Sequence, residues 1–470
     1  MGKEFIREKF SNNKQLLDSE DENYVHNLYK RAIKLHKKGD LDQAILSYKK
    51  IILSAPKFAK VYNNLGVALR AKNLFPAAIS AYEKSLSLAP NDAGTLSNMG
   101  NALRAIGKFK DAEKAHRKAI KVNPLYTEAT YNLGLVLKDM GHFEKAIECF
   151  NLVLSQKPDH IEAHWDRSLT YLQSGDLLRG FEEYEWRWKL KRNPPRDFIS
   201  PLWRGENLNN KTLLIHCEQG IGDSIQFARY IVILRQFGGK LILECQSPLK
   251  RLLNNLNECE VYSRGEELPD FDYHIPLLSI PKILATTIGK IPNKVPYIFP
   301  YIEDVMLYKK LIQGPDNWLK VGICWAGKPS QGNDRNRSSG LEPFLSILGI
   351  KNTIFYSLQV GPRANEIKEY GATGLIYDLS ADLHDFAHTA AVIDNLDLVI
   401  SVDTSVAHLA GAMNKKLWIT LCYTGDWRYL HKKTTTDWYP SAELIQQEKF
   451  GDWESVFKRI KNKLENYKKD

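Results

Sequence analysis

Two successive blocks of 34 residues decide the fold of the N-terminal third of the chain. Residues 57–90 read KFAKVYNNLGVALRAKNLFPAAISAYEKSLSLAP, and residues 91–124 read NDAGTLSNMGNALRAIGKFKDAEKAHRKAIKVNP. Three residue types recur at intervals of 34 residues over a longer stretch: Ala44, Ala78, Ala112 and Ala146; Pro56, Pro90, Pro124 and Pro158; Gly66, Gly100 and Gly134. A strict period of 34 with small residues and prolines in phase predicts a solenoid of helical hairpins.

Each block has the features of two packed helices. Tyr62, Leu65 and Leu69 form an apolar face at helical spacing, and Gly66 lets a neighbouring helix pack closely. Pro90 ends the second helix, because proline cannot donate a backbone hydrogen bond. These positions resemble the tetratricopeptide repeat, which implies a concave surface that binds peptides. A weaker first repeat covers 28–56. A degenerate fifth repeat starts at His164 and carries Gly180 and Tyr184 in the alanine and aromatic positions, as expected of a terminal cap that meets another domain.

Composition narrows the class of protein. The chain has 470 residues, 43% of them hydrophobic, and a net charge of +10, but no long apolar run and no recognised nucleic-acid motif. The six cysteines are scattered without a CxxC pair, so they predict reduced core residues rather than a metal site. One basic and aromatic cluster, 186–196, is interpreted as the last solenoid helix running into a Pro194-Pro195 linker. We expect a cytoplasmic protein with no membrane span and no nucleic-acid partner; peripheral attachment to the inner face of a membrane stays open.

The period changes after Pro201, where strand-like runs begin to alternate with helical ones. The predicted strands are 212–217, 240–245, 321–325, 354–359, 398–402 and 417–421. Alternation of this kind predicts parallel sheets, and the proline-rich region 276–300 divides them into two doubly wound halves. A cleft between two such halves is a natural ligand site.

Three turns after these strands carry candidate functional residues. Asp223 follows two glycines, Gly220 and Gly222, so it either faces the cleft or caps the next helix. Arg335 and Arg337 lie in a loop at 327–338, where they bind a diphosphate or belong to an exposed mobile loop.

The third turn runs through 401–412, where a buried strand meets a helix that begins with small polar residues. Free amides and hydroxyls at Thr404 and Ser405 suit a pyrophosphate. The alternatives are that Asp403 only caps the helix and that His408 is a core histidine.

These turns, in this order, resemble glycosyltransferase family 9, the bacterial heptosyltransferases, and in particular relatives that carry tetratricopeptide repeats. The most specific motif is Asp403-Thr404-Ser405-x-x-His408-Leu409-Ala410-x-Ala412. It is supported by Gly222-Asp223, Asn333-Asp334-Arg335-x-Arg337-Ser338, Gly425-Asp426-Trp427-Arg428 and Trp438-Tyr439-Pro440. Ser405 stands where the family usually has glycine, and Arg335 or Arg337 takes the place of the usual lysine.

The resemblance implies an α + α/β protein: a tetratricopeptide solenoid, then a GT-B-like pair of Rossmann-like halves. The expected parts are an N-terminal extension (1–24), the solenoid (25–192), a linker (193–210), an acceptor half (211–305) and a nucleotide-sugar half (306–470).

The implied reaction is inverting, metal-independent transfer of a sugar from a nucleoside-diphosphate donor to a glycan, lipid-linked or protein acceptor, with no cofactor besides the donor. Asp223 is the candidate general base. The candidate donor-binding residues are Arg335, Arg337, Ser338, Asp403, Thr404, Ser405 and His408. Further candidates are Gly220, Gly222, Gln226, Asp426, Trp427 and Arg428.

Two other functions stay open. The chain could be a non-catalytic repeat scaffold with a degenerate transferase domain, because fold does not guarantee activity. It could also modify proteins, with the repeats presenting the acceptor segment. In the transferase hypothesis the repeats bind the acceptor or a protein partner and leave the chemistry to the C-terminal halves.

Overall fold

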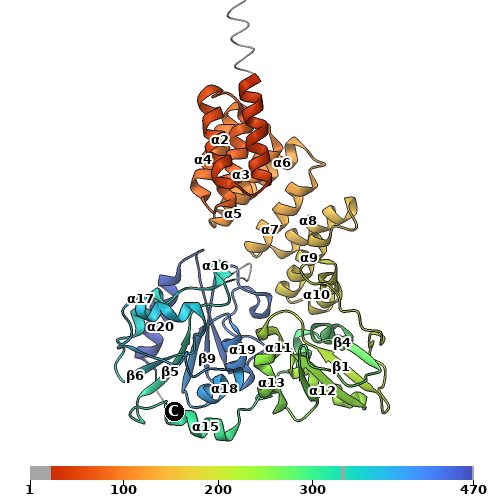
Figure 1. Ribbon diagram of the computed structural model, residues 1–470, viewed down its shortest axis with the longest axis vertical. Helices are drawn as coiled ribbons and strands as arrows, with labels where there is room; N and C mark the ends of the chain where they lie inside the picture. Colours follow the sequence, from red (N-terminus) through yellow and green to blue (C-terminus); the bar gives the residue numbers. More distant parts are fainter. Residues whose placement is uncertain (1–22, 330–333, 468–470) are drawn as a thin grey trace, which may run out of the picture. The chain divides into compact units, whose positions relative to one another are not determined.

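The computed structural model describes residues 23–329 and 334–467 and divides into two compact units between Ala163 and His164. The expected N-terminal extension therefore lies almost wholly outside the described residues. The first unit is a stack of helices and the second contains two β-sheets (Figure 1).

The first unit is built from helical hairpins that follow the 34-residue period. A helix over 23–37 is followed by α2 (Leu41–Ser54), α3 (Ala59–Ala71), α4 (Phe75–Leu88), α5 (Ala93–Ala105), α6 (Phe109–Val122), α7 (Thr127–Asp139) and α8 (Phe143–Gln156). The periodic glycines explain the close packing within each hairpin. A Cβ at Gly66 would lie 2.5 Å from the ring of Tyr82, and a Cβ at Gly100 or Gly134 would lie 2.5 or 2.7 Å from a ring on the next helix. The predicted tetratricopeptide solenoid is confirmed.

Polar side chains join successive hairpins along the stack. Asn98 donates to Asn63 Oδ1 over 3.0 Å, and Asn132 donates to Ser97 Oγ over 3.4 Å. Both bonds join residues 35 positions apart, one more than the repeat period, so the period also fixes the register between hairpins.

The second unit begins with the fifth hairpin. Its helices are α9 (Ile161–Ser174), which crosses the boundary, and α10 (Leu177–Tyr184), followed by the 3₁₀ turn η1 (Glu185–Lys189). Leu172, Leu177, Phe181 and Tyr184 are buried in the same core as the first sheet. The division of the chain at 163/164 thus falls before the boundary at 192 that the repeat period predicts, because these apolar side chains pack onto the α/β part.

The first sheet has four parallel strands in the order β3-β2-β1-β4. Its strands are β1 (Thr212–His216), β2 (Lys240–Cys245), β3 (Glu260–Ser263) and β4 (Tyr273–Pro276). Its helices are α11 (Ile221–Phe227), α12 (Arg229–Leu234), α13 (Ser247–Asn254) and α14 (Ile280–Ile283).

The second sheet has six parallel strands in the order β10-β9-β8-β5-β6-β7. Its strands are β5 (Leu319–Cys324), β6 (Thr353–Ser357), β7 (Ile376–Asp378), β8 (Leu398–Val402), β9 (Leu417–Leu421) and β10 (Ala442–Gln446). The helices of this part are α15 (Ile302–Lys309), α16 (Asp334–Arg337), α17 (Glu366–Glu369), α18 (Phe386–Asp394), α19 (Ser405–Ala412) and α20 (Trp453–Glu465). Two parallel sheets with helical connections make the predicted GT-B-like pair of Rossmann-like halves, and α11 of the first packs against α19 of the second (Figure 1).

The packing of the fifth hairpin onto the α/β part leads to a prediction about which N-terminal truncations still fold. A fragment starting at residue 159 retains α9 and α10 and should unfold cooperatively. A fragment starting at Pro195 loses the four buried side chains of that hairpin, each contributing about 1.5–3 kcal/mol, against a total stability of only about 5–15 kcal/mol. It should be insoluble or melt far lower in thermal unfolding followed by circular dichroism. Equal melting temperatures of the two fragments would contradict the assignment of this hairpin to the second unit.

Candidate functional site

A cavity of about 790 Å³ lies at the carboxyl ends of strands from both sheets. The turn after β1 contributes Gln219 to Asp223. The turns after β5, β6 and β8 contribute 326–329, 358–363 and 403–406. Side chains that line it with charged or hydrogen-bonding groups are Gln219, Asp223, Lys328, Arg337, Gln359, Arg363, His384, Asp385, Thr389, Asp403, Thr404, Ser405, His408, Asp426 and Arg428. Parallel strands bring these turns to one edge of each sheet, as the sequence predicted.

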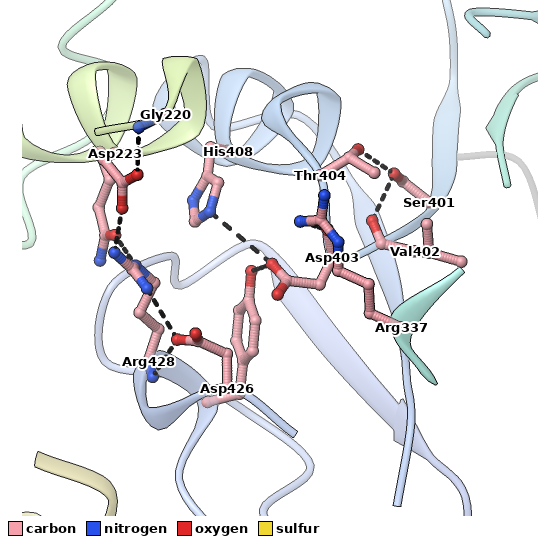
Figure 2. Close-up of polar contacts among 12 residues, drawn as sticks. Gly220, Asp223, Arg337, Ser401, Val402, Asp403, Thr404, His408, Asp426 and Arg428 are labelled. Atoms are coloured by element: carbon pink, nitrogen blue, oxygen red, sulfur yellow. Dashed lines mark hydrogen bonds and ion pairs between the residues drawn. The ribbon is translucent and has the colours of Figure 1, made fainter. Parts of the chain in front are cut away.

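Arg428 is the centre of the polar network on one side of this cavity. Its guanidinium contacts Asp223 Oδ1 and Gln226 Oε1 on α11, and Asp426 Oδ1 at 2.8 Å on its own turn (Figure 2). Its side chain is only 8% exposed. The pair between Arg428 and Asp223 thus joins a residue of the second half to a residue of the first.

Asp223 combines both roles that the sequence left open. Its Oδ2 accepts a 2.8 Å hydrogen bond from the backbone N–H of Gly220 and so caps α11, and the side chain also lines the cavity with 19% of its surface exposed. Burial raises the pKa of this carboxyl above its ordinary value, whereas Arg428 and the Gly220 N–H act in the opposite direction. The carboxylate is held in one orientation and keeps an exposed edge.

A second carboxylate, Asp403, lies at the end of β8. It accepts a 2.9 Å hydrogen bond from the Tyr429 hydroxyl, and His408 Nε2 lies 3.8 Å away. Burial, reinforced by Asp426, raises the pKa of Asp403 to about 6. His408 bonds Tyr439 through Nδ1 at 2.8 Å, and burial lowers its pKa well below the ordinary value, so the ring is neutral at pH 7.

The start of α19 approaches α11 closely. A Cβ at Gly222 would lie 2.7 Å from the His408 ring and 3.5 Å from Ser405 Cα. The Thr404 hydroxyl pairs with Ser401 at 2.9 Å rather than capping the helix (Figure 2). The first amides of α19 therefore face the cavity without a side-chain cap, which suits an anionic group.

The arginine loop is only partly at the cavity. Arg337 lines it and donates to the Asp403 carbonyl at 3.1 Å, while Asp334 lies 3.4 Å from the Arg337 Nε. Ser338 bonds Asp334 and the Gly327 N–H, so it shapes the loop rather than lining the cavity. Arg335 is exposed and is not a lining residue. Asn333 of the predicted motif lies outside the described residues.

Two further candidates, Trp427 and Gln226, are buried in the protein and do not line the cavity. Trp427 packs edge-on against Phe181 at 5.7 Å and against Trp438 at 5.9 Å, so it belongs to the core rather than to the cavity wall. Gln226 is fully buried beneath Arg428.

The sequence analysis missed the turn after β6, with Gln359 and Arg363. Its signal was available: a Gly-Pro turn with an arginine directly follows a predicted strand. Within the described ranges, no cluster of three or more His, Cys, Asp or Glu side chains could hold a metal ion, and no helix is long and apolar enough to cross a membrane.

Comparison with known families places both parts of the chain. Tetratricopeptide-repeat models match residues 57–124 and 103–167, and the glycosyltransferase family 9 (heptosyltransferase) model matches residues 362–427. The matched segment of family 9 runs from the turn after β6 through α19 to the Asp426 turn, and so covers much of the cavity wall of the second half. The architecture is that of a repeat solenoid joined to a GT-B-like domain. The chain carries tetratricopeptide repeats in its N-terminal part and a glycosyltransferase family 9 domain in its C-terminal part.

Individual relatives resemble only part of the chain, at identities of 22–30%. Protein FlbA of Caulobacter vibrioides is 26% identical over 331 residues, which are 64% of this chain and 54% of that protein. The chain thus spans about half the length of this curated relative. Among solved structures, MamA is 30% identical and covers 34% of this chain and 92% of its own, with a TM-score of 0.31. YrrB, titled a TPR protein with an unusual peptide-binding site, is 22% identical over 36% of this chain and 86% of its own, with a TM-score of 0.31.

Asp403 gives a prediction about stability and pH. Its pKa is raised from 3.8 to about 6, so the native state binds this proton more tightly than the unfolded chain. The contribution of Asp403 to stability therefore falls as the pH rises between these two values, by about 3 kcal/mol, and is constant above. Asp403→Asn removes that loss, so the variant should gain stability relative to wild type between pH 4 and 6.5. Urea unfolding of both proteins across this range measures the difference; parallel curves would show that Asp403 titrates normally.

Proposed function

We propose that the protein transfers a sugar from a nucleoside-diphosphate sugar to an acceptor hydroxyl, with inversion at the anomeric carbon. The supporting observation is that one cavity is lined by Asp223 from the first half and by Arg337 and the α19 start from the second. A base and an anion-binding surface in the same cavity are what such a transfer needs.

In the proposed reaction Asp223 removes the proton of the acceptor hydroxyl. The acceptor oxygen forms a bond to the anomeric carbon from the face opposite the leaving group. The bond between that carbon and the diphosphate oxygen breaks, and its electron pair leaves with the nucleoside diphosphate. Because Arg428 and the Gly220 N–H fix the carboxylate, its exposed edge is directed at the acceptor without a rearrangement.

The leaving diphosphate gains negative charge as this bond breaks. Arg337 and the uncapped amides at the start of α19 are positioned to stabilise that charge, and Thr404 and Ser405 contribute hydroxyls. We propose that these groups take the part that a divalent cation plays in other transferases. His408, neutral at pH 7, orients Asp403, which is available to sugar hydroxyls.

The repeats bind the acceptor or a protein partner in this proposal, and the protein acts in the cytoplasm. The acceptor is a glycan, a lipid-linked saccharide or a protein segment. The support is the tetratricopeptide match over residues 57–167 together with the concave surface that such stacks provide.

The first experiment is a calorimetric and thermal-shift panel with ADP, GDP, UDP and CDP and their common sugar conjugates. Selective stabilisation by one nucleotide, followed by release of that nucleoside diphosphate from its sugar conjugate in the presence of EDTA, would support metal-independent transfer. Binding of none of them at millimolar concentration would favour the non-catalytic scaffold. Turnover that needs added magnesium or manganese would overturn the metal-independent mechanism.

Asp223→Asn should remove most of the transfer and leave donor binding intact. A general base contributes about 10²–10⁴-fold to the rate, and the asparagine side chain is nearly isosteric. The control is Asp426→Asn, which also removes a carboxylate from Arg428 but leaves the α11 turn unchanged. Turnover should fall far more in Asp223→Asn than in the control, as measured by release of nucleoside diphosphate. An equal loss in both variants would assign the effect to Arg428 rather than to a base.

Arg337→Ala should weaken binding of the nucleoside diphosphate, and Arg335→Ala should not. Loss of a charged hydrogen-bonding partner costs about 1.5–3 kcal/mol, or roughly 10- to 100-fold in affinity. Of these two arginines only Arg337 lines the cavity, and Arg335, two positions away in the same loop, is the matched control. Isothermal titration calorimetry measures both affinities. Unchanged affinity in Arg337→Ala would exclude this arginine from the diphosphate site.

A further inference from the structure

The fifth hairpin makes direct polar contacts with the loop that carries Asp223. The Tyr184 hydroxyl at the end of α10 donates to Gln219 Oε1 over 3.0 Å. Arg187, fully buried in η1, donates to Glu218 Oε1 over 2.9 Å and to Ser279 Oγ over 2.7 Å. Two adjacent residues of the loop, just before Gly220, are therefore held by side chains from the terminal repeat.

The same hairpin also contacts the loop that carries Arg428. Gln173 near the end of α9 donates to the Gly425 carbonyl over 2.9 Å. Phe181 on α10 packs edge-on against Trp427 with ring centroids 5.7 Å apart. One hairpin thus contacts a cavity loop from each half, and the ion pair between Asp223 and Arg428 joins the same two loops on the cavity side.

The backbone of the first loop needs support from its surroundings. Gln219 has φ +62°, in the left-handed region that non-glycine residues rarely adopt, and its own side chain lines the cavity. Such a conformation persists only where neighbouring groups hold it. The Tyr184 hydroxyl bonds its side chain, and Gln246 Nε2 bonds its carbonyl over 3.3 Å. Loss of one of these two supports should therefore loosen the turn that places Gly220 and Asp223.

We propose that the terminal repeat is a positioning element of the active site: Tyr184 holds the Asp223 loop, and Gln173 holds the Arg428 loop. The catalytic part of this proposal rests on the proposed function, since it assumes that Asp223 is the base. It differs from the expectation that the repeats only select the acceptor, because the last of them determines the geometry of the catalytic carboxylate. Tyr184 and Gln173 touch neither donor nor acceptor in this role.

The test uses the full chain with two conservative variants. Tyr184→Phe removes only the hydroxyl that bonds Gln219, and Gln173→Met removes only the amide that bonds Gly425. Tyr171→Phe is the matched control, because it deletes a tyrosine hydroxyl from the same hairpin for which no bond to either loop is found among the described residues. Hydrogen exchange should become faster at 218–223 in Tyr184→Phe and at 424–428 in Gln173→Met, and at neither loop in Tyr171→Phe. All three melting temperatures should stay close to that of wild type.

Turnover is then measured with the nucleotide sugar selected from the panel above. Misplacement of a reacting group by about 1 Å can cost 100-fold, so kcat should fall by roughly 10- to 100-fold in both variants, with KM for the donor unchanged. Unchanged exchange at both loops would overturn the inference, as would a lowered melting temperature with faster exchange throughout the second unit. If wild type shows no turnover, the proposed function fails, and the exchange measurements still decide whether the hairpin holds the two loops. If the exchange changes are seen while kcat is unaltered, the contacts hold the loops but do not position the base.

Discussion

The burial of the Arg428 guanidinium is the constraint on which the rest of the site depends. A charge that is taken out of water costs several kcal/mol unless partners compensate it. Burial disfavours the charged form, but Asp426 and Asp223 outweigh this effect, so the pKa of Arg428 is raised. Since one partner comes from its own turn and another from α11, the charge can stay buried only when the two halves are close. The glycine at 222 makes this approach sterically possible, because a side chain there would meet His408.

An ion pair at Asp223 is compatible with its proposed role as a base. A carboxylate has about four sites that can accept a hydrogen bond. Arg428 takes one on Oδ1 and the Gly220 N–H takes one on Oδ2, so acceptor sites remain on the edge that faces the cavity. Burial raises the pKa of this carboxyl and thereby makes it a better proton acceptor, while Arg428 acts in the opposite direction and favours the carboxylate. Burial therefore strengthens Asp223 as a proton acceptor, and Arg428 limits the rise in its pKa.

The sequence predicted those features that local pattern determines. The 34-residue period predicted the solenoid, because small residues are required wherever two helices approach closely, as at Gly66 and Gly134. Strands with long apolar runs, such as β2 and β8, were predicted within a residue of their bounds. The strands β3, β4, β7 and β10 were not predicted. The first three have only three or four residues, and the apolar residues of β10 are interrupted by Glu443.

Contacts between distant segments could not be predicted from the sequence. Asp223 and Arg428 were both candidates, but nothing in either motif indicated that they pair across 205 positions. For the same reason Trp427 could not be distinguished as core, because its aromatic neighbours come from α10 and from the segment after β9.

The position of the fifth hairpin follows from the same physics as the ion pair. A solenoid needs a terminal repeat whose outer face is covered or polar. Here Leu177 and Phe181, on the face that would otherwise be exposed at the end of the stack, pack into the core of the α/β unit. The repeat that ends the solenoid is therefore also the one whose apolar side chains complete the core of the α/β part. This hairpin thus belongs to the repeat period by its sequence and to the α/β core by its buried side chains, and Gln173 and Tyr184 contact the cavity loops from it.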